Sequence, residues 1–434
     1  VPADRADEPI AIIGMNGRFP DAGSVAEFWR NLREGLDSIV EVPNDRWDHQ
    51  RFFTEEYQGR TSIYAKWGAF LDDVAGFDPL LFRITHADAR HIDPQERLFL
   101  ENVYGTMEDA GYCAFPEDPV DVGVFVGVMY GHYQLLALER TLQGKETITS
   151  SAYASIANRV SYVFNFSGPS IAVDTMCSSS LTSIHLACEA LRRNECSMAI
   201  AGGVNVTIHP DKYRFLSAQH FASTDGRCRA FGAGGDGYVP GEAVASVLLK
   251  PLRDAERDND HIYAVIRGTA TNHGGKTNGY TVTNPNAQAA VISRALEKSS
   301  ISARDVTYIE AHGTGTQLGD PIEIRGLVKA FSADTDETGF CRIGSVKSNI
   351  GHAEGAAGIV SLIKTVEQLR NHEIVPSLHS RVLNPQIDFD RTPFVVAQDL
   401  QEWKPTGTKH DGVHGTLIAG VSSFGAGGAN VHMV

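Results

Sequence analysis

Apolar and polar positions change along the chain in blocks that predict strands and helices in turn. The segment "EPIAIIGMNGRFP" starts as a short apolar run and then meets glycines, which predicts a buried strand followed by a glycine turn. "VDVGVFVGVMY" is almost continuously apolar, as in a strand of a sheet that is covered on both faces. In "HIDPQERLFLENVYGTMEDAG", Asp93, Pro94 and Glu96 stand where a capping box would start a helix. The two patterns alternate to the end, which indicates an α/β fold.

A longer internal symmetry divides the chain in two. "PSIAVDT" leads into a cysteine and a helix, and much later "RIGSV" leads into the loop "KSNIGH" and the helix "AEGAAGIVSLIKTVEQL". We therefore predict a polar linker over 1–8 and two related halves over 9–255 and 256–434, divided near "SVLLKPLRDAERDNDH". The spacing of the second helix predicts one apolar face, formed by Ile359, Leu362, Ile363, Val366 and Leu369.

The composition narrows the class of protein. The chain has 434 residues, 42% hydrophobic content and a net charge of -15, and it lacks the clustered Lys and Arg that a nucleic-acid groove requires. Its apolar runs are shorter than the roughly 20 residues of a membrane span. Six cysteines without a CxxC pair, and no signal peptide, indicate reduced thiols in the cytoplasm and argue against a zinc site. Because the chain begins with Val1, we expect it to be part of a longer polypeptide.

Cys177 lies where a predicted strand gives way to a predicted helix. Ser178, Ser179 and Ser180 follow it as candidate caps, and helical apolar spacing then begins. The N–H groups and dipole of a helix N-terminus would lower the pKa of the Cys177 thiol and could hold an oxyanion. A buried structural thiol is the alternative for Cys177, and it is the preferred interpretation for Cys113, Cys188, Cys196, Cys228 and Cys341.

Two histidines follow predicted strands in glycine-rich loops. In "VTYIEAHGTGTQLGDPIEIRGL" a strand ends at His312, and Asp320, Pro321 and Glu323 are predicted to start a capped helix. In "GSVKSNIGHAEGAAG" the second loop holds His352. The carboxyl ends of strands in α/β sheets are where ligands bind. We interpret other histidines as solvated loop residues, among them His91, His185, His209 and His372.

A cysteine with two neutral histidines suggests one reaction class. The thiolate takes an acyl group from a thioester and forms a covalent intermediate. A second, carboxylated thioester then loses CO2, which generates the carbanion equivalent without a strong base. Two imidazole N–H donors can stabilise the enolate oxygen. The enolate then attacks the acyl-cysteine and forms a carbon–carbon bond.

Four segments, "DTMCSSSL", "EAHGTGTQLGDPIE", "GSVKSNIGHAEGAAG" and "SSFGAGGANVH", resemble the β-ketoacyl synthase domain of modular polyketide synthases. The resemblance extends over essentially the whole chain. It implies an α/β thiolase-type fold of two related βαβαβαββ halves in a layered α-β-α-β-α core. It also implies an acyltransferase that is usually a homodimer within a larger multidomain polypeptide. Its partners would be an upstream donor carrier protein and a malonyl carrier protein of the module. No cofactor or metal would be bound, since phosphopantetheine arrives on the carrier.

The resemblance assigns roles to single residues. Cys177 would accept the acyl chain, and His312 and His352 would support decarboxylation and condensation. Lys347 matches the family lysine, with Glu354 as its ionic partner, although a purely structural pair is an equal alternative. The remaining assignments are backbone N–H groups of Cys177 and Phe424 for the oxyanion hole, pantetheine contacts for Thr314 and Thr316, and structural support for Asn349 and Glu354.

The subtype and the reaction leave alternatives. "DTMCSSSL", "NHGGKTNGYTVTNPNAQ" and "GGDGYVPGEA" resemble bacterial synthases whose acyltransferase acts in trans, with departures at Gly131, His132, Thr283 and Ala429. Thiolases carry a second cysteine in the C-terminal glycine loop, and residues 422–430 have none. We favour extension of the acyl chain. The alternatives are a domain that only transfers acyl chains, a branching domain that acts at a β-carbon, and a scaffold without turnover.

Overall fold

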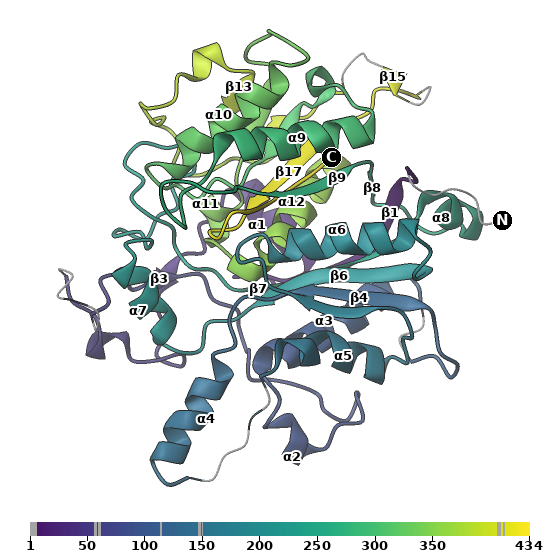
Figure 1. Cartoon of the computed structure of the whole chain (residues 1–434). Coiled ribbons are helices and arrows are strands. Elements are labelled where there is room, and N and C mark those ends of the chain that lie inside the picture. The colour runs from purple at the N-terminus through teal and green to yellow at the C-terminus, as the bar shows by residue number, and fades with distance from the viewer. Residues whose placement is uncertain are drawn as a thin grey trace.

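Two six-stranded sheets and the helices around them form five layers (Figure 1). The structure is a computed structural model, and it describes residues 7–55, 59, 62–112, 115–145, 149, 151–405, 409–410 and 413–434. The first sheet has the order β5 (Ser170–Val173), β4 (Val122–Gly127), β6 (Met198–Asn205), β7 (Ala243–Pro251), β1 (Ile10–Arg18) and β8 (Ala264–Ile266). The second has the order β13 (Phe394–Val396), β11 (Cys341–Gly344), β10 (Tyr308–Glu310), β17 (Ala419–Phe424), β18 (Ala429–Met433) and β9 (Thr269–His273).

The two sheets repeat one topology. In the first, β5, β4 and β6 are parallel, and β7 and β1 follow in antiparallel pairs. In the second, β11, β10 and β17 are parallel, and β18 and β9 follow in antiparallel pairs. The predicted related halves are therefore confirmed in strand order and in strand direction. The strand β8, which comes after residue 256, adds an edge to the first sheet.

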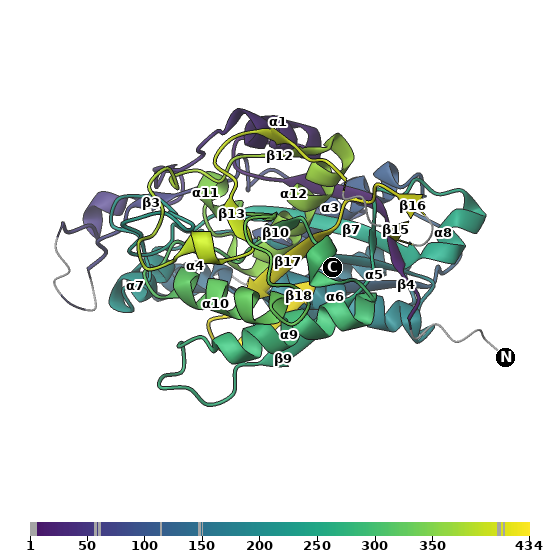
Figure 2. The ribbon, with the colours of Figure 1, turned by 90° about the horizontal axis from the view of Figure 1, so that it is seen from above.

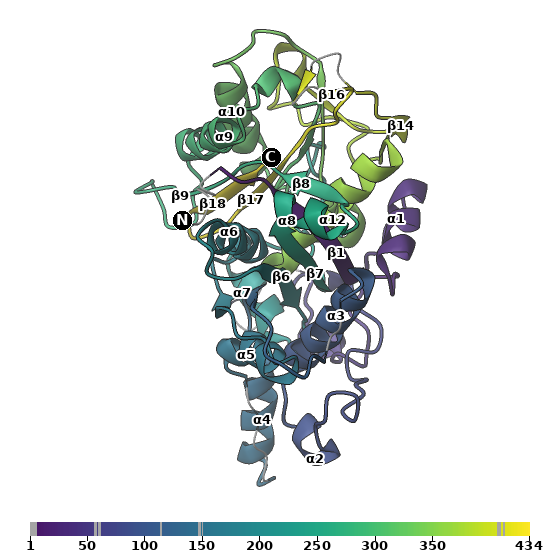
Figure 3. The same cartoon turned by 90° about the vertical axis from the view of Figure 1, so that its right-hand side faces the viewer.

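Helices fill the space between the sheets and cover both outer faces. The side view in Figure 3 shows α6 (Ser179–Arg192) and α12 (Ala357–Asn371) between the sheets. The outer faces carry α3 (Pro94–Asp109) with α5 (Tyr153–Val163), and α9 (Pro285–Ser299) with α10 (Gly319–Phe331), the last two side by side in Figure 2. The other elements are α1 (Val25–Glu34), α2 (His86–Ala89), α4 (Tyr133–Leu142), α7 (Asp211–Ala218), α8 (Leu252–Asp258), α11 (Lys347–Ile350), β2 (Val40–Glu41), β3 (Trp67–Gly68), β12 (Glu373–Ile374), β14 (Gln401–Glu402), β15 (Lys409–His410) and β16 (Val413–His414).

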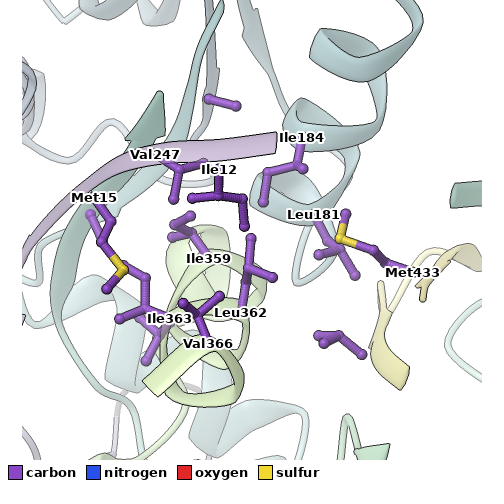
Figure 4. Close-up of a cluster of buried hydrophobic side chains, with 14 of the residues drawn as sticks. Ile12, Met15, Leu181, Ile184, Val247, Ile359, Leu362, Ile363, Val366 and Met433 are labelled. Atoms are coloured by element: carbon purple, nitrogen blue, oxygen red, sulfur yellow. The ribbon is translucent and has the colours of Figure 1, made fainter. Parts of the chain in front are cut away.

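The middle layer forms the largest shared core. The predicted apolar face of α12 packs there, with Ile359, Ile363 and Val366 at most 1% exposed, against Leu181 of α6 and Ile12 of β1 (Figure 4). Side chains of this size each stabilise the fold by about 1.5–3 kcal/mol when fully buried. The core therefore joins the two halves directly, through α6, which follows the Cys177 turn, and α12, which follows the His352 loop. We call this turn and this loop the two reactive loops. No helix among the described residues has the length and apolarity to cross a membrane.

Two local predictions in the first half are wrong. The strand β1 does not end in a glycine turn but runs through Gly14 and Gly17, both paired with β7. Gly14 is needed for close packing instead, since a Cβ there would lie 2.7 Å from the Cβ of Ala110. Asp93 caps α3 by accepting from the Gln95 amide at 2.9 Å, but Glu96 pairs with Arg159 and leaves the capping box unformed.

Candidate active site

Cys177 lies on a sharp turn between β5 and α6. The residue before it, Met176, has φ +58°, a left-handed conformation that is strained for a side chain with a Cβ. The Asp174 carboxylate accepts from the Met176 amide at 2.9 Å, and the Ser179 hydroxyl accepts from the Thr175 amide at 2.9 Å. These bonds hold the turn that presents the thiol at the start of α6.

The sequence suggested that the serines after Cys177 cap α6, but their side chains do not do so. Ser178 is the N-cap residue, but its hydroxyl donates to the Thr175 carbonyl at 2.9 Å and makes no capping bond. The Ser180 hydroxyl accepts from the amide of Ile359 at 3.0 Å, at the start of α12. The serine cluster thus shapes the Cys177 turn and links the two helices that follow the two reactive loops.

Close packing of α6 on α12 brings the two reactive loops together. Gly358 permits it, because a Cβ at that position would lie 2.6 Å from the Leu181 amide nitrogen. His352 precedes α12 as Cys177 precedes α6. The backbone of His352 is fixed by its amide, which donates to Val239 at 2.7 Å, and by its carbonyl, which accepts from Gly241 at 2.8 Å.

The predicted residues of the second half gather around this point. The ring centroids of His312 and His352 are 5.4 Å apart, and that of Phe424 is 5.8 Å from His312. The Ser423 hydroxyl donates to the Cys177 carbonyl at 2.8 Å and connects β17 to the turn that carries Cys177. Cys177, the two histidines and the glycine loop that follows β17 therefore form one site between the halves.

The thiol does not have the lowered pKa that the helix N-terminus suggested. Burial raises the pKa of Cys177 to about 12, and the negative charge of Glu354 acts in the same direction. Backbone N–H groups of Ala426 and Cys177, together with the charge of Lys347, lower the pKa by less. Desolvation outweighs the helix terminus here because the side chain is only 6% exposed. The raised pKa keeps the Cys177 side chain in the thiol form near neutral pH.

We expect alkylation of Cys177 by iodoacetamide to accelerate about tenfold per pH unit between pH 7 and 9. The thiolate is the reactive form, and its fraction grows tenfold per unit well below the pKa. Peptide mass spectrometry after timed labelling measures the rate, with a Cys177→Ala sample as background. A rate that levels off below pH 8 would show that the thiol is already ionised near neutrality.

Both histidines are neutral in the site. Burial lowers the pKa of His312 and of His352 well below the ordinary value, and the charge of Lys347 lowers both further. The Nδ1 atom of His352 accepts a hydrogen bond from the Glu354 amide at 3.0 Å, so the ring hydrogen lies on Nε2. That Nε2 atom is buried and has no hydrogen-bond partner among the described residues. It is therefore a buried donor without an acceptor among the described residues.

The carboxylates after His312 hold its loop instead of capping α10. Glu323 accepts from the amides of His312 and Gly313 at 2.7 and 2.8 Å. Asp320 accepts from the amides of Gly315 and Phe231 at 3.1 and 2.7 Å. The predicted capping role is therefore wrong. Both carboxylates accept hydrogen bonds from loop amides, which have no partner in a strand.

We expect Glu323→Ala to lower the free energy of unfolding by about 2–4 kcal/mol, because it leaves two buried N–H groups without an acceptor. Chemical denaturation followed by circular dichroism measures this change. Gln317→Ala, an exposed position of the same loop, is the control and should change stability by less than about 0.5 kcal/mol. Equal losses in the two variants would mean that the carboxylate does not support the loop.

The predicted Lys347–Glu354 pair is not formed. Glu354 pairs with Lys212 of α7, and both side chains are fully buried. Burial lowers the pKa of Lys347, while the charges of Glu310 and Glu323 oppose that shift. Glu310 in turn forms an ion pair with Lys364 at 2.7 Å. The sequence pattern missed Lys212 and Lys364 because neither lies in a reactive loop.

The remaining predicted site residues make hydrogen bonds or other contacts within the protein. The Thr314 and Thr316 hydroxyls lie 3.2 Å apart in the loop after His312. The Asn349 side chain donates to the Leu36 carbonyl at 3.0 Å and so connects the loop before His352 to the segment after α1. The backbone donor that reaches the sulfur from the glycine loop belongs to Ala426, two residues after Phe424. Cys113 lies outside the described residues, whereas the other predicted structural thiols are free and buried: Cys188, Cys196, Cys228 and Cys341.

A thiol at a helix start that shares one site with two neutral imidazoles, between two like halves, defines a thiolase-type enzyme of acyl transfer. Family models for the N-terminal and C-terminal domains of β-ketoacyl synthases match residues 7–255 and 263–381. The chain therefore belongs to the β-ketoacyl synthase family, as the sequence motifs predicted.

Named relatives place it among ketosynthases of polyketide synthases. It is 55% identical to polyketide synthase PksL of Bacillus subtilis over 99% of this chain and 10% of that protein. It is 54% identical to polyketide synthase ThaG of Burkholderia thailandensis, over 100% of this chain and 8% of that protein. The chain thus spans about a tenth of the length of these relatives.

Solved ketosynthases share the fold. The oxazolomycin ketosynthase domain OzmH KS7 of Streptomyces albus has a TM-score of 0.94 at 53% identity, covering 98% of this chain and 73% of its own. The ketosynthase from module 6 of the bacillaene synthase of Bacillus subtilis has a TM-score of 0.89 at 39% identity, covering 98% and 71%. The predicted thiolase-type fold is therefore confirmed.

Proposed function

We propose that this domain extends acyl chains in polyketide biosynthesis. It takes an acyl chain from an acyl carrier protein onto Cys177 and condenses it with malonyl carrier protein. The observation that carries the proposal is the pair of neutral histidines in the Cys177 site, with the Nε2–H of His352 buried and unpaired. A pair of neutral N–H donors suits an enolate oxygen that develops in a dry site.

The reaction balances with these residues alone. The Cys177 sulfur attacks the acyl thioester, the bond to the pantetheine sulfur breaks, and the thiol proton leaves with that sulfur. The carboxylate of the malonyl group then departs as CO2 and leaves its electron pair as the enolate, held by His312 and His352. The enolate carbon bonds to the acyl carbonyl, the bond to Cys177 breaks, and the thiolate regains a proton from water. Burial keeps both imidazoles neutral, and the charge of Lys347 acts in the same direction.

The oxyanion on the acyl thioester needs two donors of its own. We propose the amides of Cys177 and Phe424, as the resemblance implies. The amide of Ala426 lies in the same glycine loop and acts on the thiol sulfur, and the ring of Phe424 lies beside His312. Thr314 and Thr316 keep their predicted role at the pantetheine arm, which the carrier protein supplies, so that the domain itself needs no bound cofactor or metal.

The setting of the domain follows from the same resemblance. We propose a homodimer within a larger cytoplasmic polypeptide of the type whose acyltransferase acts in trans, with halves at 9–255 and 256–434. The departures from that pattern flank the site, since Gly131 and His132 follow β4, and Thr283 lies in the loop beside Gly425–Gly428. They would alter the acyl chain that is accepted.

Two-stage mass spectrometry of the intact protein tests extension. Simple acyl thioesters are offered first, and an acyl adduct on Cys177 is expected. Malonyl carrier protein is then added, and the carrier should gain the acyl chain and lose CO2. Loading without extension across several acyl groups would overturn the proposal in favour of transfer alone. A carrier product with the malonyl unit added at the β-carbon of an enone would favour branching.

A further inference from the structure

A fully buried ion pair lies behind His352 and has no part in the scheme above. Lys212 of α7 pairs with Glu354, and neither side chain is exposed. The Lys212 ammonium also donates to the Thr207 hydroxyl at 2.9 Å and lies 4.8 Å from the ring centroid of Tyr130. Burying such a pair contributes little to stability compared with apolar side chains of similar volume. We therefore look for a role of the Lys212–Glu354 pair other than stability.

Glu354 connects this pair to the catalytic imidazole. Its backbone has φ +46°, which a residue with a Cβ rarely adopts. In this conformation its amide donates to Nδ1 of His352 at 3.0 Å. Besides Lys212, the Tyr238 hydroxyl at 3.1 Å and the Asn205 side-chain amide at 3.2 Å donate to the carboxylate. The carboxylate is the anchor that keeps the strained residue, and so its amide, in place.

We propose that Lys212 is a positioning residue for condensation, which holds Glu354 so that the ring hydrogen of His352 stays on Nε2, toward the enolate. The inference rests on the proposed function. The charge of Lys212 also acts on His352 directly, because it lowers the pKa of that imidazole after burial, Lys347 and His312. Acyl loading uses Cys177 and the backbone amides near it, so it should not depend on Lys212.

Lys212→Met tests this division. It removes the charge, keeps most of the volume, and leaves the Glu354 carboxylate without its cation. We expect acyl loading within about threefold of the unmodified protein and condensation slower by about 10- to 100-fold. The deficit should be larger at pH 6 than at pH 8.5, because an unpaired carboxylate favours the imidazolium form. The other groups that face His352, namely His312, Tyr238 and Lys347, stay unchanged.

Two further variants separate positioning from folding. Lys212→Met combined with Glu354→Gln removes both charges, so we expect condensation to recover at least tenfold over Lys212→Met alone. Lys250→Met is the matched control: this lysine is 5% exposed and pairs with Asp258 and Asp260 at the far end of β7. It should condense at the normal rate. Equal loss of loading and condensation in Lys212→Met, or no recovery in the double variant, would overturn the proposal.

A readout without turnover keeps this test separate from the proposed function. With ring-15N histidine, the Nδ1 signal of His352, identified by its loss in His352→Gln, should show an unprotonated nitrogen that changes in Lys212→Met. If the unmodified protein loads but does not condense, the proposed function fails. The 15N signal of His352 Nδ1 then decides by itself whether Lys212 positions this ring. If Lys212→Met does not fold, Glu354→Gln breaks the same pair. Loading must then survive while condensation falls, and equal loss refutes the role.

Discussion

We expect Cys177→Ala to abolish acyl loading while the domain stays folded. The substitution removes only the sulfur of a side chain that is already 6% exposed, and it leaves the Met176 turn with its bonds from Asp174 and Ser179. The other described thiols are buried as well, and Cys228, which interacts with the charge of Lys347, accepts a hydrogen bond from the Val239 amide at 3.1 Å. We expect the acyl adduct to fall at least about a thousandfold, as when a nucleophile is removed outright.

Intact-protein mass spectrometry after incubation with acyl thioesters measures this loss. Cys196→Ala makes the same chemical change at a buried thiol after α6 and should load normally. Thermal unfolding of both variants should stay within a few degrees of the unmodified protein. An adduct that persists on Cys177→Ala would place the nucleophile elsewhere, and the interpretation of the site would fall with it.

The architecture could be predicted from the sequence because the same hydrophobic pattern occurs once in each half. The same order of strand, reactive residue and helix surrounds Cys177 and His352, and α6 and α12 pack against each other as that symmetry requires. Glycine-rich loops after apolar strands marked both histidines. These signals are local, since each depends on residues within a few positions along the chain.

What could not be predicted depends on distant partners and on burial. Glu354 was matched to Lys347 by resemblance to the family, yet its partner Lys212 comes from α7 in the other half. Glu323 and Glu96 fit capping patterns but bind loop amides and Arg159. The pKa of Cys177 was expected to fall from the helix terminus alone, whereas desolvation dominates. Acidic residues that flank a glycine loop are the one signal that could have indicated the role of Glu323.

We expect His312→Ala and His352→Ala to keep acyl loading and to lose condensation. Each removes one neutral donor from the enolate oxygen, so we expect condensation to slow by about 100- to 1,000-fold, the usual effect of one missing donor in such a site. Loading should stay within about threefold, because the sulfur, the Cys177 and Ala426 amides and the Met176 turn are unchanged.

The two variants should differ in stability, and that difference checks the assigned geometry. His352→Ala leaves the Glu354 amide without its acceptor in a fully buried place, whereas the Nδ1 atom of His312 has no partner to lose. Chemical denaturation should therefore show about 1–3 kcal/mol of destabilisation in His352→Ala and less in His312→Ala. The exposed His91→Ala is the control for both assays. If loading fell as far as condensation in either variant, that histidine would act in the transfer of the acyl chain to Cys177, and its role in condensation alone would be wrong.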